Sequence, residues 1–212
     1  MTTRVLIIDD HPLLRRGVMQ LLELENDLEP VGEASDGSEG LQLAQKLAPD
    51  LILLDLNMDG MTGVETLRAL REQGSEACVV VLTVSDSDED ITNALRAGAN
   101  GYLLKDMEPE ALVAQLRRAA EGEVVISDTL TSSLARALTK DRPTSESNLD
   151  TLTAREREIL RHLARGESNK TIARNLGITE GTTKVHVKNL LKKMNFRSRV
   201  EAAVWAVQKG FK

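Results

Sequence analysis

Residues 51–55 (LILLD) place four consecutive apolar residues directly before a carboxylate. Such a run predicts a strand buried on both faces, as in a parallel sheet that helices cover on each side. Similar apolar runs occur at residues 5–8 (VLII), 79–82 (VVVL) and 102–104 (YLL), and a weaker one lies at 28–32. The chain therefore contains five candidate strands of one buried sheet.

Between these runs lie amphipathic segments of helical length, at residues 12–25, 37–47, 63–73, 87–97 and 109–121. Strand and helix alternate five times, which predicts a doubly wound α/β domain with a five-stranded parallel sheet. In such domains the functional site lies at the carboxyl ends of the strands. The residues that follow each strand are therefore the candidates for chemistry.

Three carboxylates, a hydroxyl and an ammonium follow the predicted strands, namely Asp9, Asp10, Asp55, Thr83 and Lys105. Carboxylates this close repel one another unless a cation joins them, and carboxylate oxygens with water suit Mg²⁺. A carboxylate can also attack phosphorus and form an aspartyl phosphate, whose oxygens a metal, Lys105 and Thr83 would neutralise. An aspartate after a strand is often only a turn residue or a helix cap. Five suitable groups at the correct strand ends favour a phosphoryl site.

Composition excludes several classes of protein. With 41% hydrophobic and 28% charged residues among 212, the chain is typical of a globular protein of one or two domains. One cysteine excludes an internal disulfide framework, and with three histidines it leaves too few ligands for a structural zinc site. Charges interrupt residues 1–10 and no apolar run approaches about 18 residues, so we expect neither a signal peptide nor a membrane partner.

Charge divides the chain into two parts. Residues 1–130 carry 10 basic and 25 acidic residues, a net charge of −15, whereas residues 151–212 carry 14 basic and 5 acidic residues, a net charge of +9. Residues 131–150 are neutral and include a polar stretch around Pro143 that is typical of a linker. The asymmetry indicates two modules with different partners.

Helix-start signals follow one another in the basic part. Thr153 and Glu156 fit a capping box, and Ser168 can cap a second, short helix. A tight turn with glycine follows, and Thr179 can cap a longer helix at about residues 180–194. A short helix, a tight turn and a longer helix form a helix-turn-helix.

The longer helix carries a cationic face. At about 100° per residue, Lys184, Val185 and Lys188 share one face, while the apolar residues lie on the opposite side. An outer face of this kind suits the major groove of DNA, and we expect these three residues to contact base edges. The expected phosphate contacts are Lys170, Lys192, Lys193 and Arg197.

The acidic part resembles the receiver domain of response regulators, which has a flavodoxin-like fold. The matching segments are residues 8–12 (IDDHP), 53–58 (LLDLNM), 82–83 (LT) and 101–105 (GYLLK). This resemblance implies that Asp55 accepts a phosphoryl group, that Thr83 and Lys105 contact it, and that Tyr102 is an aromatic switch. The implied Mg²⁺ ligands are Asp9, Asp10, Asp55 and the main-chain carbonyl of Asn57. One position departs from the family, because Asp59 stands where proline is usual.

The basic part resembles the LuxR-type helix-turn-helix of the NarL (FixJ) subclass of response regulators. The matching segments are residues 152–156 (LTARE), 168–173 (SNKTIA), 182–188 (TTKVHVK) and 197–203 (RSRVEAA). The resemblance implies a cytoplasmic bacterial regulator of nitrate- or nitrite-responsive genes that receives its phosphoryl group from a sensor histidine kinase. It further implies a chain that is monomeric before phosphorylation and that pairs partly through its last helix, from Ser198 to about Gln208, on inverted-repeat double-stranded DNA. That helix places Val200, Ala203, Val204 and Val207 on one face, for which core packing is the simplest interpretation.

Together these patterns predict a receiver at residues 1–125, a helix and linker at 126–148 and a helix-turn-helix domain at 149–212. Because the two parts have opposite net charges, we expect the unphosphorylated receiver to cover the lysine face of the DNA-reading helix. Phosphorylation of Asp55 would shift this equilibrium and release or dimerise the DNA-binding part.

Other functions are weighed by specific residues. An aspartate-nucleophile phosphatase would need a second acid two residues after Asp55, where Asn57 stands, so an enzyme is not expected. The phosphoryl-site residues argue against a ligand-sensing or phosphorylation-independent LuxR-type regulator, which stays the alternative. The basic part argues against a receiver that docks only to protein. His11 is expected to shape the loop into the first helix, and Cys78 to be a buried structural thiol.

Overall fold

The computed structural model describes residues 2–127 and 149–211. The predicted linker at residues 126–148 therefore lies almost entirely outside the described residues. Among the described residues no helix combines the length and the apolar composition that crossing a membrane requires.

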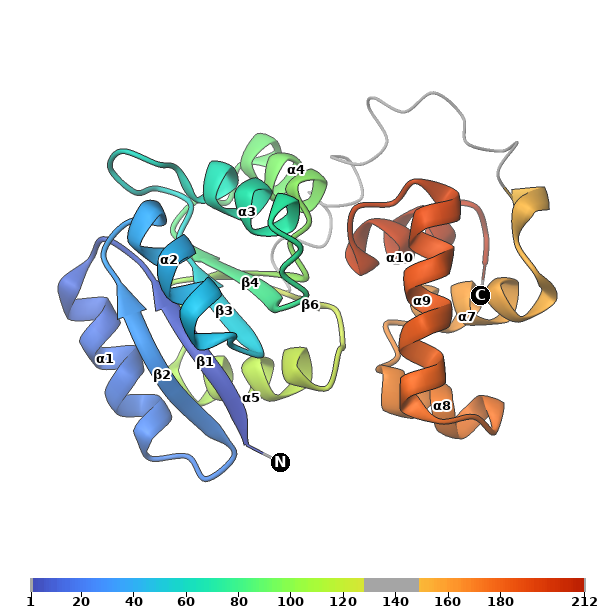
Figure 1. Cartoon of the computed structure of the whole chain (residues 1–212), viewed down its shortest axis with the longest axis horizontal. Helices are drawn as coiled ribbons and strands as arrows, with labels where there is room; N and C mark the ends of the chain where they lie inside the picture. Colours follow the sequence, from blue (N-terminus) through green and yellow to red (C-terminus); the bar gives the residue numbers. More distant parts are fainter. Residues whose placement is uncertain (1, 128–148, 212) are drawn as a thin grey trace.

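A parallel sheet forms the centre of the acidic part (Figure 1). Its strands are β1 (Thr3–Ile8), β2 (Leu28–Ala34), β3 (Leu51–Leu54), β4 (Cys78–Thr83), β5 (Gly101–Leu104) and β6 (Val125–Ile126), in the order β2-β1-β3-β4-β5-β6. The five predicted strands are confirmed. The sixth, β6, corrects the expected strand number, because two residues beside an edge strand leave no periodic pattern in the sequence.

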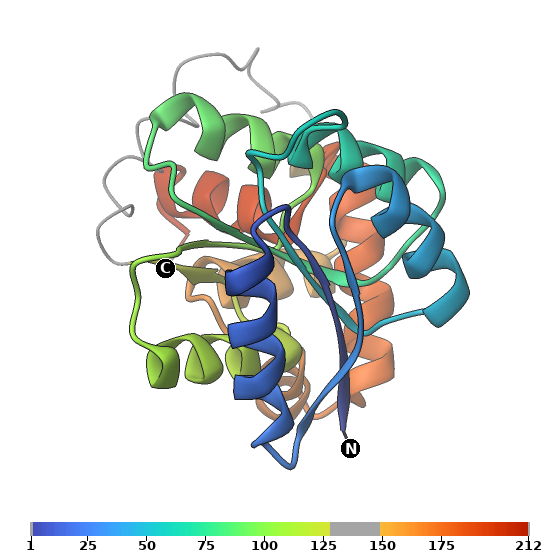
Figure 2. The same cartoon turned by 90° about the vertical axis from the view of Figure 1, so that its left-hand side faces the viewer.

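Helices cover both faces of the sheet (Figures 1 and 2). One face packs against α1 (Pro12–Glu23) and α5 (Pro109–Ala120). The other packs against α2 (Gly37–Leu47), α3 (Gly63–Glu72) and α4 (Asp88–Ala97). These five helices match the predicted segments to within two residues at each end, and the doubly wound architecture is confirmed.

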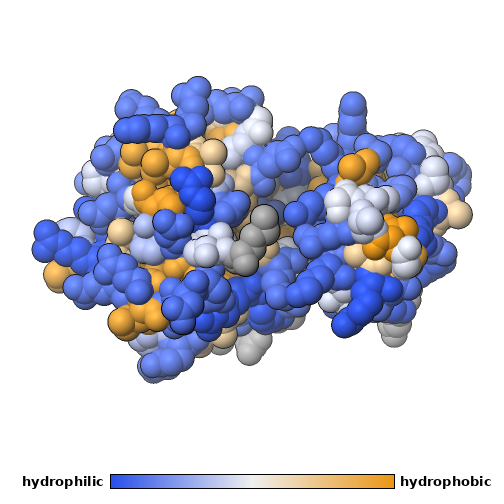
Figure 3. All heavy atoms as spheres, turned by 60° about the horizontal axis from the view of Figure 1, so that its bottom comes forward, coloured by the Kyte–Doolittle hydropathy of each residue, from blue (hydrophilic) through white to orange (hydrophobic). Residues whose placement is uncertain are grey.

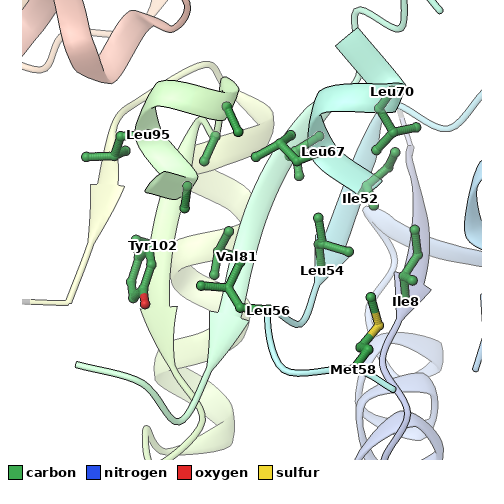
Figure 4. Close-up of a cluster of buried hydrophobic side chains, with 14 of the residues drawn as sticks. Ile8, Ile52, Leu54, Leu56, Met58, Leu67, Leu70, Val81, Leu95 and Tyr102 are labelled. Carbon is green, nitrogen blue, oxygen red and sulfur yellow. The ribbon is translucent and has the colours of Figure 1, made fainter. Parts of the chain in front are cut away.

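The register of the sheet brings the polar residues together. Ile8 pairs with Leu54, and Leu54 pairs with Val81, so that the ends of β1, β3 and β4 lie at one edge. Figure 4 shows Ile8, Leu54 and Val81 in one apolar layer, with Leu67 of α3 packed above them. This layer fixes the positions of the residues that follow each strand.

The basic part is helical, with α7 (Ala154–Ala164), α8 (Asn169–Leu176), α9 (Glu180–Met194) and α10 (Arg199–Gln208) around its own apolar core. The predicted caps are confirmed, since Thr153 forms a capping box with Glu156, and Ser168 and Thr179 each accept a backbone hydrogen bond. The side chain of Thr183 donates to the Thr179 carbonyl at 3.1 Å, which satisfies its hydroxyl on the packed side of α9.

Candidate functional site

Two buried carboxylates and one lysine form the centre of the acidic site. Asp9 follows β1 and Asp55 follows β3, and both side chains are almost fully buried. The Lys105 ammonium, at the end of β5, lies 2.7 Å from Asp55 Oδ2 and 2.8 Å from Asp9 Oδ2. The ammonium therefore offsets the cost of burying two carboxylates side by side.

Asp10 and His11 complete the acidic cluster on its open side. Asp10 Oδ1 is buried, and apart from a 2.8 Å contact with His11 Nδ1 it has no partner within residues 2–127 and 149–211. A buried carboxylate oxygen without a hydrogen bond is costly unless a cation binds it. Carboxylate oxygens are the donors that Mg²⁺ prefers, so the residues present fit such an ion. The described residues contain one cluster of this kind, formed by Asp9, Asp10, His11 and Asp55.

Thr83 and Asn57 lie on the other side of Asp55. The Thr83 hydroxyl is fully buried and lies 3.5 Å from the Asn57 side-chain nitrogen. The Asn57 main-chain nitrogen donates to Asp55 Oδ1 at 3.4 Å. The structure therefore places Asp9, Asp10 and Lys105 beside Asp55 and connects Thr83 to it through Asn57.

Tyr102 reaches the loop that follows Thr83. Its side chain is fully buried, and its hydroxyl donates to the Ser85 carbonyl at 2.9 Å. Burial raises the pKa of Tyr102 above its ordinary value, so the phenol is neutral. The ring lies in the same apolar layer as Val81 (Figure 4), and its hydroxyl links β5 to the end of β4.

Asp59 contacts the acidic cluster through its backbone. Its main-chain nitrogen donates to Asp10 Oδ2 at 3.2 Å. Proline has no N–H, so the residue that is usual in the family could not make this bond. The departure at residue 59 therefore adds one hydrogen bond that orients a carboxylate of the cluster.

Gly63 lets α3 begin directly against the site. A Cβ at this position would overlap the Asp55 carbonyl oxygen and lie 2.7 Å from the Leu56 Cα. The Gly63 nitrogen donates to the Leu56 carbonyl at 3.0 Å. Only glycine fits this close approach of two backbones. The sequence motifs do not identify Gly63, because the need for glycine arises from a contact between the start of α3 and the loop after β3.

The lysine face of α9 is exposed as predicted. Val185 is 57% exposed, Lys188 extends beside it, and Val187, Leu190 and Met194 are buried on the opposite side. Three of the four expected phosphate contacts have other partners in the structure. Lys193 donates to the buried Glu156 carboxylate at 2.8 Å, Arg197 donates to a receiver carbonyl, and the Lys170 ammonium lies 3.9 Å from Glu121 Oε1. Burial favours the neutral form of Glu156, but the hydrogen bonds from Lys193 and Thr153 outweigh it and lower its pKa.

The two parts of the chain touch through α9 and the residues that follow it. The Lys188 ammonium lies 2.5 Å from Glu76 Oε1, and this hydrogen bond lowers the pKa of Glu76. Arg197 donates to the Arg96 carbonyl at 3.1 Å. A groove of about 1140 Å³ lies along this junction, and Lys184 and Val185 line it. On the face of the molecule drawn in Figure 3, hydrophilic residues cover most of both parts, with smaller hydrophobic patches between them.

The last helix, α10, corrects the expectation of a single core face. Val200 is fully buried in the apolar cluster of the receiver part and Val204 packs against it, whereas Val207 is 58% exposed. Arg199 is buried beside Cys78, and burial lowers the pKa of its guanidinium to about 10. The sequence pattern identified an apolar stripe but could not tell which part of the chain it covers.

Family comparisons match both parts of the chain. Residues 5–117 match the response regulator receiver domain, and residues 150–206 match the bacterial regulatory proteins of the luxR family. The fold and the acidic site thus define a response regulator. The chain belongs to the response regulators that join a receiver to a LuxR-type DNA-binding domain.

Relatives share nearly the full length of the chain. It is 56% identical over 204 residues to the nitrate/nitrite response regulator protein NarL of Escherichia coli strain K12, covering 96% of this chain and 94% of that protein. It is 50% identical to a nitrate/nitrite response regulator protein homolog of Haemophilus influenzae, covering 95% and 94%. A crystal structure of the response regulator ChrA of a heme-sensing two-component system aligns with a TM-score of 0.54 at 34% identity, covering 100% of this chain and 99% of that one.

These findings identify a transcription regulator that phosphorylation controls, and not an enzyme. Its two domains imply DNA and a sensor kinase as partners. Receiver domains bind Mg²⁺ at an acidic phosphorylation site, and this chain has an aspartate-rich cluster at the corresponding strand ends.

Proposed function

We propose that Asp55 accepts a phosphoryl group from a sensor histidine kinase and that this switches DNA binding by α9. The observation that carries the proposal is the position of Lys105, whose ammonium lies 2.7 Å from the buried Asp55 carboxylate. A buried carboxylate with an ammonium beside it is suited to nucleophilic attack on phosphorus, because the cation neutralises charge that develops on the oxygens.

In this proposal Asp9, Asp10, Asp55 and the main-chain carbonyl of Asn57 hold Mg²⁺. The ion, when bound, neutralises negative charge on the phosphoryl oxygens. An oxygen of Asp55 attacks phosphorus, and the bond from phosphorus to the kinase histidine breaks, so the phosphoryl group moves intact.

Lys105 and Thr83 then take new partners. Lys105, which now donates to Asp55 Oδ2, donates to a phosphoryl oxygen instead. The Thr83 hydroxyl donates to a second phosphoryl oxygen and leaves its place near the Asn57 amide. Because Tyr102 bonds the Ser85 carbonyl two residues further on, movement of Thr83 reaches Tyr102, which acts as the switch.

The switch would act on the junction between the two parts of the chain. In the structure the lysine face of α9 borders the groove at the junction, and Lys188 is bound to Glu76. The side chains of this face stay accessible to water, but in this proposal the receiver beside α9 leaves no room for a DNA duplex to dock on it. Phosphorylation opens the junction only by as much as it favours the open form over the closed one.

On DNA, the open form would present Lys184, Val185 and Lys188 to base edges in the major groove. The proposed phosphate contacts are Lys170, Lys192, Lys193 and Arg197. For Lys193 this contact requires release of the Glu156 carboxylate to which it is bound. Two phosphorylated copies would pair partly through α10 and recognise inverted-repeat sites.

The two relatives named for nitrate and nitrite support the same signal for this chain, at 56% and 50% identity. We place the regulator in the bacterial cytoplasm, where chromosomal DNA and the kinase domain of its partner are found. The proposed domain bounds are 1–125 for the receiver, 126–148 for the connection and 149–212 for the DNA-binding domain.

Binding of the full-length chain to pooled genomic fragments tests the proposal, with Mg²⁺, before and after addition of beryllofluoride as a phosphoryl mimic. We expect beryllofluoride to tighten specific binding in the wild type and to leave an Asp55→Ala variant unchanged. Fragments that are enriched only in the presence of the mimic would reveal the half-site spacing. Equal binding in both states would refute control by Asp55.

A further inference from the structure

We propose that His11 is a ligand of the cation held beside Asp55, so that the site binds nitrogen-preferring divalent metals as well as Mg²⁺. The inference rests on the cation site of the proposed function and adds an imidazole to its oxygen donors. Sequence reasoning assigned His11 only to the loop before α1. The structure instead places its ring among the carboxylates.

The distances within the cluster fit a shared ion. His11 Nδ1 lies 2.8 Å from Asp10 Oδ1 and 3.1 Å from Asp9 Oδ1. Two ligands that bind one ion at about 2.1 Å and at right angles are separated by about 3.0 Å. His11, Asp9, Asp10 and Asp55 each offer one ligand atom, and all these atoms lie within 4.8 Å of one another. The spacing is therefore that of neighbouring ligands in an octahedral shell.

The backbone holds the ring in this position. The His11 main-chain nitrogen donates to Asp9 Oδ1 at 2.8 Å, and Pro12 begins α1 directly afterwards. Although His11 occupies the N-cap position of α1, its side chain makes no capping hydrogen bond. The ring is thus directed to the carboxylates and not to the free N–H groups of the helix.

Lys105 binds the other oxygens of the two buried aspartates, and its ammonium lies 3.5 Å from His11 Nδ1. Its ammonium contacts the Oδ2 atoms of Asp9 and Asp55, whereas His11 faces the Oδ1 atoms of Asp9 and Asp10. Asp10 Oδ1 is also the buried oxygen for which the described part of the chain supplies no other partner. Because the His11 side chain is 63% exposed, an ion reaches its nitrogen from solvent.

The mixed donor set has a chemical consequence. Carboxylate oxygens suit Mg²⁺ and Mn²⁺, whereas imidazole nitrogen suits later first-row metals such as Ni²⁺ and Zn²⁺. A site with one imidazole ligand therefore binds Ni²⁺ and Zn²⁺ more tightly than a site with oxygen ligands alone. His11 therefore raises the affinity for Ni²⁺ much more than the affinity for Mg²⁺.

Pulsed electron paramagnetic resonance of bound Mn²⁺ tests the inference directly, because a coordinated imidazole adds a nitrogen modulation to the signal. The full-length chain, purified without a polyhistidine tag, is compared with His11→Ala and with His186→Gln as a remote histidine control. We expect nitrogen modulation in the wild type and in His186→Gln, and its loss in His11→Ala.

Calorimetric titration gives a second readout. Loss of the imidazole should weaken Ni²⁺ binding by about tenfold or more, since even outer partners of metal ligands contribute this much, and change Mg²⁺ binding by less than about twofold. Mn²⁺ that binds wild type without nitrogen modulation would overturn the role of His11 while leaving the cation site intact. Tighter Mg²⁺ binding by His11→Ala would also overturn it, because the ring would then compete with the ion. Absence of any Mn²⁺ binding to the wild type would refute the cation site itself.

Discussion

Removal of the Glu76 carboxylate should open the junction between receiver and DNA-binding domain. Glu76 lies in the loop between α3 and β4 and bonds Lys188 on the face of α9 that we propose to read DNA. The Glu76→Ala substitution is made in the receiver, so every proposed DNA contact stays unchanged. A gain in DNA affinity by the unphosphorylated chain would therefore report the opening of the junction alone.

The expected gain follows from the exposure of the two side chains. Lys188 is 75% and Glu76 is 80% exposed, so the pair is worth about 0.2–1 kcal/mol, the range for surface ion pairs. If the open form is the minor one, its population rises by the same free energy, and DNA affinity rises by about 1.4-fold to fivefold. Glu76→Lys replaces attraction by repulsion and should give a larger gain.

Fluorescence anisotropy with labelled operator DNA measures these affinities. Glu72→Ala is the matched control, because Glu72 is an exposed acid near the end of α3 for which the structure shows no ion pair among the described residues. DNA binding itself weakens with salt, so the DNA affinity of each variant is divided by that of the wild type at the same salt concentration. The ratio should be largest at about 0.05 M salt and approach one at about 0.5 M, where charges are screened within a few ångströms.

Two results would refute this reasoning. If Glu76→Ala and Glu76→Lys both bind DNA as the wild type does at low salt, the ion pair does not hold the junction closed. If the gain persists undiminished at high salt, its origin is not the attraction between Glu76 and Lys188. A gain in the Glu72→Ala control of the same size would point to net charge instead of this contact.

Three further predictions concern stability and reactivity. Gly63→Ala should destabilise the receiver by about 1–3 kcal/mol in urea unfolding, because the new Cβ meets backbone, whereas Gly17→Ala in α1, with open space around it, should not; equal effects would contradict the close approach. Glu156→Gln should lower the free energy of unfolding by about 1–3 kcal/mol at neutral pH, because it removes the carboxylate that accepts the charge-assisted hydrogen bond from Lys193. Since the pKa of Glu156 is lowered in the folded state, this difference should disappear as the pH falls through the lowered value, and a difference constant with pH would refute it. Burial raises the pKa of Cys78 to about 12, so iodoacetamide should alkylate the native chain at pH 8 about a hundredfold or more slower than the urea-unfolded chain, and similar rates would exclude a buried thiol.

Local chemistry explains why much of the fold could be predicted. The strands β1, β3 and β4 are apolar runs whose pattern depends only on neighbouring residues, and the caps at Thr153 and Ser168 act within one helical turn. Strand β6 could not be predicted, because Val125–Ile126 is a strand only through its pairing with β5. A local sequence pattern cannot predict a strand that forms only because a segment distant in the sequence pairs with it.

The same distinction holds for the candidate site. The rule that strand ends meet at one edge of a parallel sheet was enough to bring Asp9, Asp55 and Lys105 together. It could not show that Lys193 bonds Glu156, since those two side chains are far apart in sequence and on different helices. It could not show either that the Asp59 nitrogen bonds Asp10, because that contact depends on the path of a loop.

The sequence by itself determined the order of strands and helices, the two oppositely charged parts, and the groups available for phosphoryl and DNA chemistry. These properties follow from the spacing of residues along the chain and from their types. Only the tertiary structure decided that the ring of His11 enters the acidic cluster, that Val200 packs against the receiver, and that Lys188 meets Glu76. The reason is physical: each of these depends on the direction of a side chain and on a surface that another segment of the chain supplies, and neither is encoded in local spacing.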